Sequence, residues 1–331
     1  MIEQGAPLIW VLADDRAGHA NQALGVADAL GLPYENKSLA YNGLSKLPNI
    51  ILGATFLHLS GDALGPPWPA LVIAAGRRTV PVARAIKRVS DTPCYLVQCM
   101  WPGTGAGAID LIALPAHDSP HRRANMLRTV AAPHRITAAV LAEARREWQA
   151  TLGTLPAPRI ALLVGGSTAA HDFDAAAARA LAGRVTAFAQ TRGGSVMVTT
   201  SRRTSPAARD ALVATVEAAH RFDGSGDGDN PYLGYLALAD VLVVTGDSTT
   251  MCAEACATGT PVLIDAPDAI TGLKHRALHR ALYDRGLARP LDGDAAAFVS
   301  QHTIPAPLDD AADIAAEIRR RLPALSEPEP A

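Results

Sequence analysis

The sequence predicts an α/β protein of two Rossmann-like domains, each built on a doubly wound parallel sheet, and three observations lead to that prediction. The chain has 331 residues, more than one hydrophobic core usually supports. Short apolar runs alternate with helical stretches along the chain, which is typical of parallel sheets covered on both faces. The stretch Leu152–Pro158 contains two prolines and a glycine that cannot continue a helix, and the alternation starts again after it.

Continuous apolar runs predict four buried strands in the first half of the chain. The first run, Leu8–Ala13, leads into a polar loop that contains a glycine and then into a helical stretch. The other strands are expected at Ala70–Ala75, Cys94–Val97 and Ile109–Leu114, and a helix is expected over Val80–Val89. Because these strands alternate with helices, the sheet that they form should be parallel.

The second half repeats this pattern. The predicted strands are Arg159–Val164, Ser195–Thr200, Val241–Val244 and Pro261–Ile264. The predicted helices are Asp174–Thr191, Pro206–Ala219 and Thr249–Thr258. The likeness between the halves is one of pattern, because no tandem repeat of residues is visible.

These boundaries divide the chain into four expected parts. Residues 1–151 and 159–305 form the two domains. A helix over Leu308–Leu322, within residues 306–323, is expected to return to the first domain. Residues 324–331, which contain the sequence SEPEPA, are too rich in proline and acid to fold and are expected to be disordered.

Composition and charge exclude several classes of protein. A net charge of −2 and 5% aromatic residues leave no basic or stacking surface, so no nucleic-acid partner is expected. No apolar run approaches the roughly 20 residues of a spanning helix and no signal peptide is recognised, which predicts a cytoplasmic protein. Short apolar patches leave open a peripheral attachment at the inner membrane. The four cysteines, Cys94, Cys99, Cys252 and Cys256, lack zinc-site spacing, so no metal is expected.

The first candidate site is the sequence VLVVTGDSTTMCAEACATGTPVLI, residues 241–264. A buried strand ends in the polar segment Thr245–Thr250, and a helix begins inside it with Asp247 or Ser248 as N-cap. Gly246 permits a close approach of another group or an unusual φ. Free N–H groups and the helix dipole attract anions, so a phosphate or diphosphate is expected here. The alternative is an ordinary capped helix whose hydroxyls satisfy their own backbone.

Hydroxyls and amides must supply most of the affinity for that anion. The dipole contributes about 0.3–1 kcal/mol, whereas each hydrogen bond to a charged group contributes roughly 1.5–3 kcal/mol. Two further loops should border the same edge. They are the glycine loop Gly165-Gly166-Ser167, too short for a Walker motif, and the pair Arg202-Arg203, whose guanidinium groups match phosphate oxygens.

The second candidate site is the loop Asp14-Asp15-Arg16-Ala17-Gly18-His19, which follows the first strand. Asp14, Asp15 or His19 is suited to accept a proton near neutral pH. The pair Arg77-Arg78 also follows a strand and should reach the same edge of the sheet. The alternatives are that an aspartate caps the helix, that His19 packs on it, and that the arginines are merely solvated.

Five stretches of the sequence carry a resemblance to a known family. They are DDRAGHANQALGVADAL, AAGRRTVPVARAIKR, VTTSRRT, NPYLGYLALADVLVVTGDSTTMCAEACATGTPV and KHRALHRALYDRGLARP, and they span roughly Ile9 to Pro290. Together they resemble the "elongated mitochondria" family of mitochondrial-fission proteins, known from plants and widespread in bacteria. The sequence departs from the family pattern after Gln98, where CMWPG replaces a more polar segment, so no site role is expected for Gln98–Gly103.

The resemblance implies a GT-B-like fold, related to nucleotide-sugar glycosyltransferases and epimerases, whose two domains face a cleft. In that class the first domain's glycine–histidine loop lies near the acceptor, which implies the residues Gly18 and His19. The second domain binds the donor. The implied diphosphate contacts are Gly166, Ser167, Arg202, Arg203, Gly246, Ser248, Thr249 and Thr250, and Glu254 would bind the ribose hydroxyls.

The expected function is transfer of a sugar from a nucleoside-diphosphate sugar to an unknown acceptor, with no metal and no bound cofactor. A lipid or an envelope glycan is the expected kind of acceptor. Two alternatives stay open. A nucleotide-sugar epimerase would use the same donor pocket without a second substrate, and a non-catalytic adaptor would match the plant members, which are linked to dynamin-type recruitment on the outer mitochondrial membrane.

Overall fold

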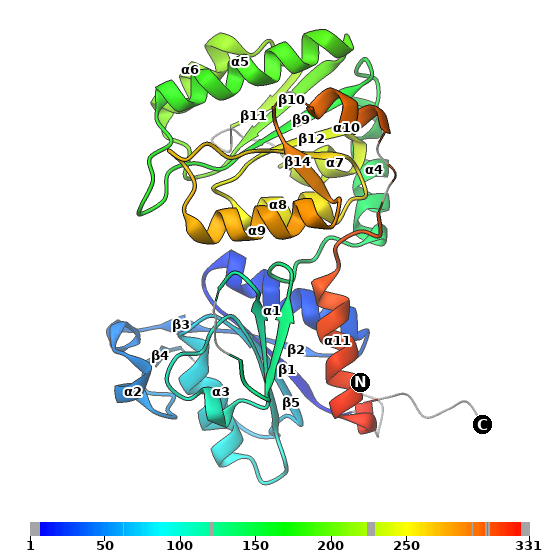
Figure 1. Ribbon diagram of the computed structural model, residues 1–331. Coiled ribbons are helices and arrows are strands. Elements are labelled where there is room, and N and C mark those ends of the chain that lie inside the picture. The colour runs from blue at the N-terminus through cyan, green and yellow to red at the C-terminus, as the bar shows by residue number, and fades with distance from the viewer. Residues whose placement is uncertain are drawn as a thin grey trace, which may run out of the picture. The chain divides into compact units, whose positions relative to one another are not determined.

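The chain folds into two compact units, each with a six-stranded parallel sheet of its own (Figure 1). The computed structural model describes residues 7–61, 63–118, 122–223, 229–292, 294–301, 303 and 305–325. The first unit takes in the chain up to Arg135 and again from Asp309 onward, and the second unit is Ile136–Leu308.

The first division of the chain lies before helix α4, Ala138–Leu152, whereas the sequence predicted it after that helix, at Leu152–Pro158. The helix belongs to the second unit because it packs against α7, Tyr232–Leu238. Gly234 allows this close packing, since a Cβ atom there would lie 2.4 Å from Cγ of Trp148. The pattern within α4 does not reveal which sheet it covers, so the predicted boundary was wrong by one helix.

The first sheet has the strand order β2-β1-β5-β6-β7-β8. Its strands are β1 Ile9–Ala13, β2 Glu35–Ser38, β5 Leu71–Ala75, β6 Tyr95–Cys99, β7 Leu111–Pro115 and β8 Met126–Thr129. A separate antiparallel pair joins β3, Ala40–Tyr41, to β4, Leu59–Ser60. The four predicted strands are all present as the central ones, and the strands that the sequence did not predict are the two at the edges.

Helices cover both faces of the first sheet. One face carries α1, Ala17–Leu30, and α11, Asp310–Arg321, which lie side by side in Figure 1. The other face carries α3, Thr79–Val89. The shorter helices of this unit are η1 Gly43–Lys46, α2 Asn49–Leu52, η2 Ala106–Ala108 and η3 Pro323–Leu325. Helix α11 therefore completes a core that begins with the first strand of the chain.

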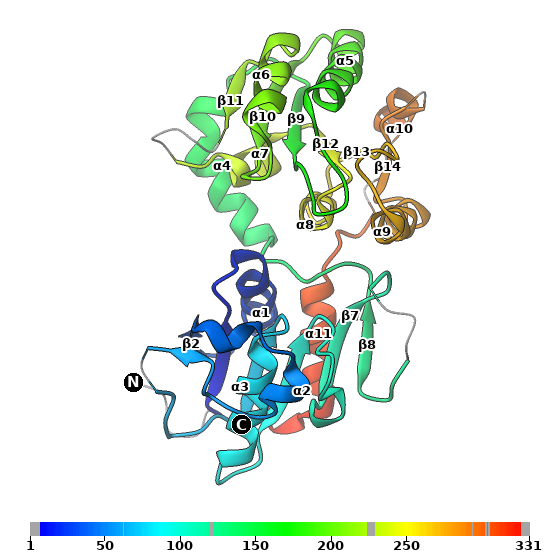
Figure 2. The same cartoon turned by 90° about the vertical axis from the view of Figure 1, so that its left-hand side faces the viewer.

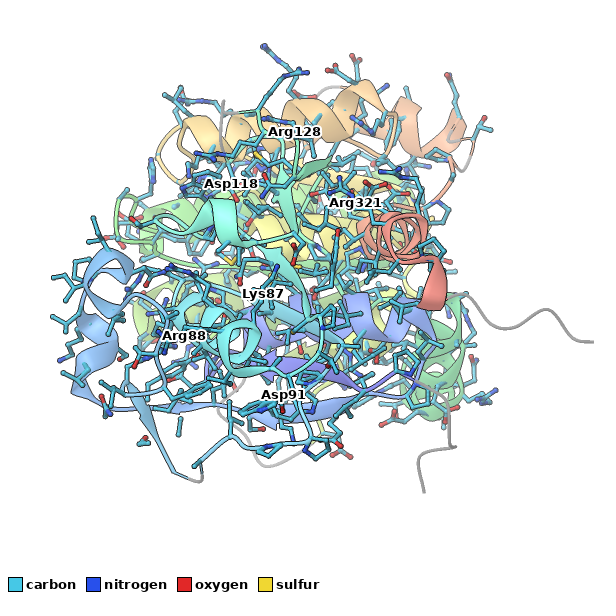
Figure 3. The ribbon with its side chains drawn as sticks, turned by 90° about the horizontal axis from the view of Figure 1, so that it is seen from below. Lys87, Arg88, Asp91, Asp118, Arg128 and Arg321 are labelled. Atoms are coloured by element: carbon cyan, nitrogen blue, oxygen red, sulfur yellow. The ribbon has the colours of Figure 1, made fainter. Side chains whose placement is uncertain are left out.

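Hydrogen bonds fasten α11 to the rest of the first unit. The Asp310 carboxylate accepts from the N–H groups of Val130 and Ala131, at 2.9 and 2.7 Å. At the other end of the helix, Arg321 donates to the carbonyl of Asp110, whose carboxylate pairs with Lys87 Nζ at 2.5 Å. Figure 3 labels Lys87 on α3 and Arg321 on α11 at this end of the unit.

The segment predicted to be disordered, residues 324–331, begins with two residues that are folded. Residues 324 and 325 belong to the short helix η3, and Leu325 is buried in the same core as α11. Burial of this leucine against the first sheet outweighs the proline content of the segment. Residues 326–331 lie outside the described part of the chain.

The second sheet has the order β11-β10-β9-β12-β13-β14. Its strands are β9 Arg159–Val164, β10 Ser195–Thr200, β11 His220–Phe222, β12 Val241–Thr245, β13 Val262–Asp265 and β14 Ala288–Pro290. Helices α5 Ala175–Arg192, α6 Pro206–Thr215 and α10 Ala295–Gln301 pack on one face, and α8 Thr249–Cys256 and α9 Leu273–Asp284 lie on the other (Figure 2). The predicted helix Pro206–Ala219 ends early because Ala219 N–H bonds the Val196 carbonyl at the edge of the sheet.

No helix in the described part of the chain is both long and apolar enough to cross a lipid bilayer.

Candidate functional site

The strand order creates one topological switch point in each sheet. In the first sheet the connections turn to opposite sides at β1 and β5, and in the second sheet they do so at β9 and β12. Ligands of open α/β sheets bind at such points, in the crevice outside the carboxyl ends of the strands. The predicted site residues lie in the loops that follow these four strands, in the loop after β10, or on helices α1 and α8. The structure thus gathers them into two groups, one in each unit.

Asp14 is the centre of the group in the first unit. Its side chain is buried, and the Arg78 guanidinium forms an ion pair with it and with the half-exposed Asp15. The Arg16 N–H donates to Asp14 at 3.1 Å. Burial alone would raise the pKa of Asp14, but the hydrogen bonds around its carboxylate and the charge of Arg78 lower that pKa below its ordinary value. Asp14 is therefore an ionised acceptor.

His19 lies beside this carboxylate. Its Nδ1 is 3.2 Å from Oδ2 of Asp14, so the imidazole donates through Nδ1 and its Nε2 is left as the proton-accepting atom. Gly76, which has a φ of +88°, makes room for the ring, because a Cβ atom there would lie 2.5 Å from Nδ1 of His19. The His–Asp pair is thus oriented from the neighbouring strand.

The other predicted residues of this group have different surroundings. Arg77 donates to the carbonyls of Ser45 and Leu47, both at 2.7 Å, so its guanidinium holds a neighbouring segment. Gly18 lies in the first turn of α1 with no atom near its Cα hydrogens. The N-cap of α1 is Arg16 with no side-chain cap, so neither aspartate caps the helix as the alternative required.

Tyr41 is a member of this group that the sequence did not reveal. The Arg78 guanidinium carbon lies 4.4 Å from the centre of its ring. Burial, together with the charge of Asp14, raises the pKa of Tyr41 well above its ordinary value. The residue stands at the end of the two-residue strand β3, where no local pattern predicts contact with a loop that is more than twenty positions away.

In the second unit, side-chain hydrogen bonds tie three loops together. Thr245 Oγ1 accepts from the Gly165 N–H at 2.7 Å, and the carbonyl of Gly165 accepts from the hydroxyls of Ser201 and Thr204, each at 2.5 Å. Asp247 Oδ2 accepts from the Gly166 N–H at 2.9 Å. The loops after β9, β10 and β12 therefore form one rigid edge.

The side chain of Asp247 is fully buried at this edge. Arg203 Nη1 lies 2.9 Å from its Oδ2 and also donates to the carbonyls of Gly166 and Ser167, at 2.9 and 3.2 Å. Oδ1 of Asp247 is buried with no hydrogen-bond partner among the described residues. Arg202 occupies the same turn as Arg203 and is exposed. The arginine pair thus divides into one residue that braces the loop and one that faces solvent.

Helix α8 starts here with Ser248 as its N-cap. The Ser248 side chain makes no capping hydrogen bond, so its hydroxyl is not used by its own helix. Thr249 and Thr250 follow in the first turn. Gly246 is required for close packing rather than for its φ, because a Cβ atom there would lie 2.6 Å from Cε1 of His279. Within the described residues, the start of α8 therefore offers N–H groups that its own N-cap side chain does not satisfy, the Ser248 hydroxyl and the positive end of a helix dipole.

Glu254 lies in the second turn of α8, partly buried. The Tyr232 hydroxyl donates to its Oε2 at 2.5 Å. Burial raises the pKa of Glu254, and the hydrogen bond from Tyr232 partly opposes that rise. A carboxylate with one oxygen already paired retains the other for a ligand hydroxyl.

Two histidines of α9 lie near this edge, although nothing in the sequence pattern predicts a site role for them. His275 Nδ1 accepts from the Gly272 N–H at 3.0 Å, and burial lowers the pKa of His275. Its ring lies 6.2 Å from that of His171. His279 is buried and donates to the Gly246 carbonyl at 3.0 Å. No group of three potential metal ligands occurs among the side chains that the structure describes.

Two Rossmann-like units with polar loops at their switch points define the GT-B class of fold, which nucleotide-sugar glycosyltransferases and epimerases share. The chain belongs to the family described as mitochondrial fission ELM1, whose model matches residues 17–322. A protein of Rickettsia prowazekii with no characterised role is 29% identical over 319 residues, covering 85% of this chain and 89% of that protein. The mitochondrial fission protein ELM1 of Arabidopsis thaliana is 28% identical over 291 residues, covering 81% of this chain and 67% of that protein.

Solved structures confirm the fold. The UDP-GlcNAc 2-epimerase of Neisseria meningitidis, bound to UDP-GlcNAc, has a TM-score of 0.54 at 11% identity, over 95% of this chain and 100% of that one. The Methanocaldococcus jannaschii UDP-GlcNAc 2-epimerase, in complex with UDP-GlcNAc and UDP, has a TM-score of 0.55 at 11% identity, over 95% and 99%. At this identity the likeness concerns the fold alone.

Proposed function

We propose that this protein transfers a sugar from a nucleoside-diphosphate sugar to an acceptor hydroxyl without a bound metal ion. The observation that carries the proposal is the free start of α8 at the switch point of the second sheet, beside the braced glycine loop. Amides and hydroxyls at such a point suit a diphosphate. The nucleotide sugars named with the solved neighbours are consistent with this class of donor.

In this proposal the diphosphate binds the N–H groups and hydroxyls of Ser248, Thr249 and Thr250. The buried Asp247 carboxylate would repel a phosphate, and the guanidinium of Arg203, 2.9 Å away, balances its charge. Arg202 is exposed in the same turn and supplies a cation to the phosphate oxygens. The positive charges and amides stabilise the nucleoside diphosphate as it leaves.

Glu254 binds the ribose of the donor. Its free oxygen accepts from one ribose hydroxyl, and the ribose competes with Tyr232 for the other. A carboxylate that accepts hydrogen bonds from a diol is a stronger acceptor than a neutral side chain. Glu254 therefore selects ribonucleotides over nucleotides that lack those hydroxyls.

His19 of the first unit is the general base. Its Nε2 takes the proton of the acceptor hydroxyl while the hydroxyl oxygen attacks the anomeric carbon of the sugar. The bond from that carbon to the diphosphate breaks, and the nucleoside diphosphate leaves with the electron pair. Asp14 is a positioning residue, because it holds the Nδ1 side of the imidazole and stabilises the charge that His19 acquires.

The test is calorimetric titration of the full chain with UDP, GDP, CDP and ADP. We expect one of them to bind, and the Glu254→Gln variant to bind it about 10- to 100-fold more weakly, because a hydrogen bond to a charged group contributes about 1.5–3 kcal/mol. Glu217→Gln is the matched control, since Glu217 is an exposed glutamate of the same unit. A folded protein that binds none of the four nucleotides would overturn the proposal.

The same preparation distinguishes transfer from epimerisation. An epimerase would convert the sugar of its donor with no acceptor present, whereas a transferase would release nucleoside diphosphate only when an acceptor is supplied. Nucleotide binding without either reaction would favour a non-catalytic adaptor over both enzymes.

A further inference from the structure

An exposed apolar surface lies on the segment between β3 and β4 of the first unit, which contains η1 and α2. Four of its side chains are large and aliphatic and stand open to solvent: Leu44 is 45% exposed, Ile50 70%, Ile51 66% and Leu57 75%. Large hydrophobic side chains exposed to this degree are few in the described residues, and half of those recorded fall within these fourteen positions. We call these four residues the aliphatic surface.

The segment that presents them is firmly held. Arg77 donates to the carbonyls of Ser45 and Leu47, and Asn49 Nδ2 donates to the Arg77 carbonyl at 3.0 Å. Asn42 caps η1 and donates to the carbonyl of Leu57 at 2.8 Å. Because the backbone is fixed by these bonds, the four aliphatic side chains cannot retract into the core.

Cations border the aliphatic surface. From Asn42 to His58 the sequence contains one lysine, Lys46, and no acidic residue. Lys46 is exposed on η1 between the aliphatic side chains. Arg77 contacts the segment as described, and Arg84 of α3 donates to the Gly53 carbonyl at 3.1 Å. The exposed side chains of the aliphatic surface are therefore apolar, and positively charged side chains lie around them.

These properties fit a lipid bilayer better than a protein partner. Protein interfaces concentrate tyrosine, tryptophan, methionine and arginine in a well-packed centre, and leucine is under-represented among their hot spots. Here the four exposed apolar side chains are leucine and isoleucine only. Leu44 lies on η1, Ile50 and Ile51 lie on α2, and Leu57 lies in the turn before β4. Aliphatic side chains bordered by cations are typical of segments that insert into the interface of an anionic membrane.

We infer that the protein docks on the surface of an anionic lipid bilayer through Leu44, Ile50, Ile51 and Leu57. The segment between β3 and β4 that carries these four residues is linked to the residues around His19. His58 Nε2 donates to the Arg78 carbonyl at 2.9 Å, and the guanidinium of Arg78 pairs with Asp14. If the proposed function holds, an acceptor presented at the bilayer, a lipid with a hydroxyl-bearing head group, would reach the base from this side. The docking itself does not depend on that function.

The experiment is flotation of the full chain with lipid vesicles. One set contains phosphatidylcholine alone, and the other contains phosphatidylcholine mixed with phosphatidylglycerol. We expect binding to the mixed vesicles that high salt weakens, and a loss of at least about tenfold in Ile50→Ser/Ile51→Ser, because two aliphatic side chains no longer leave water. The matched control is Val213→Ser/Leu273→Ser in the second unit, where the side chains are 54% and 81% exposed, and it should bind like the unchanged protein.

Three outcomes would overturn the inference: no flotation of the unchanged protein, equal loss in the control variant, or an Ile50→Ser/Ile51→Ser variant that turns an oligomer into a monomer in sedimentation. The last result would mean that the aliphatic surface joins two copies of the chain. Thermal unfolding should show that both variants are folded, since all four positions are exposed. Nucleotide titration of the same variants should be unchanged, so failure to bind nucleotide and failure to bind vesicles are separate results.

Discussion

The pKa values of two carboxylates, one buried and one partly buried, shift in opposite directions. Asp14 is surrounded by donors and a guanidinium, which lower its pKa, so it is ionised and contributes stability. Glu254 has one donor, the hydroxyl of Tyr232, and burial raises its pKa. In the proposed function, the ribose hydroxyls of the donor supply the further donors that this carboxylate lacks.

Replacing His19 tests the proposed role of the His19–Asp14 pair. His19→Gln should lower the rate of sugar transfer by about 10²–10⁴-fold, because it removes the proton-accepting nitrogen, and should leave nucleotide affinity unchanged. Asp15→Asn is the control within the same loop, since the Asp15 carboxylate is half-exposed and faces Arg78 rather than His19. Equal transfer by His19→Gln and the unchanged protein would exclude the imidazole as the base.

Glu254 predicts a dependence of stability on pH. Because its folded pKa is raised, the native state binds more protons than the unfolded state above the ordinary glutamate pKa of 4.5, and stability falls as pH rises through that window. Glu254→Gln removes this dependence while it can still accept from Tyr232. Its melting temperature should exceed that of the unchanged protein at about pH 7 and equal it at about pH 4. A variant that is less stable at neutral pH would assign Glu254 a structural role.

At the scale of single elements, the sequence predicts buried strands well and edge strands badly. The bounds of β9 and β10 agree with the prediction, because a run of apolar residues buried on both faces is visible locally. Strand β2 has alternating half-buried and exposed residues with the sequence ENKS, which no apolar pattern marks as a strand. This segment forms a strand because it pairs in parallel with the edge of β1.

The sequence also predicts some features of the candidate site and not others. Loops that directly follow predicted strands, such as Asp14–His19 and Thr245–Thr250, are found from the sequence because the end of a parallel strand marks them. Contacts between residues far apart in the sequence are not found in this way. Arg78 pairs with Asp14 from sixty-four positions away, and Tyr232 pairs with Glu254 from another helix. These depend on how the strands are ordered, which local patterns do not contain.

Helix α11 offers a test at this scale. Asp310→Ala leaves the N–H groups of Val130 and Ala131 buried without their acceptor, and should lower the free energy of unfolding by about 2–4 kcal/mol in a urea titration. Asp313→Ala, an exposed aspartate in the same first turn, is the control and should cost under about 1 kcal/mol. Equal losses would mean that the acidic first turn, not the bonds of Asp310, matters.

At the scale of the whole molecule, the two units differ in how the chain builds them. The second unit is continuous from Ile136 to Leu308. The first unit is discontinuous, since α11 supplies Ile314, Ala315 and Ile318, and η3 supplies Leu325, to a core whose other buried members come from the first 135 residues.

Fragments that correspond to the two units should therefore differ in their ability to fold alone. Residues 136–308 expressed alone should fold cooperatively and bind the same nucleotide as the full chain, because their sheet, core and α8 are complete. Residues 1–135 alone should lack a cooperative thermal transition, because removing α11 uncovers the apolar face of α1. Circular dichroism during heating and nucleotide titration of the fragments measure both expectations. A first fragment that melts as sharply as the full chain would show that α11 is dispensable.

The return of α11 has a consequence for the order in which this protein matures on the ribosome. Synthesis runs from the amino end, and most multidomain chains complete their first domain first. Here α11 belongs to the first sheet although it follows the second unit in the chain, so the second unit is synthesised in full before the first. The second unit can therefore fold first, and the core of the first unit is completed only after α11 has been translated.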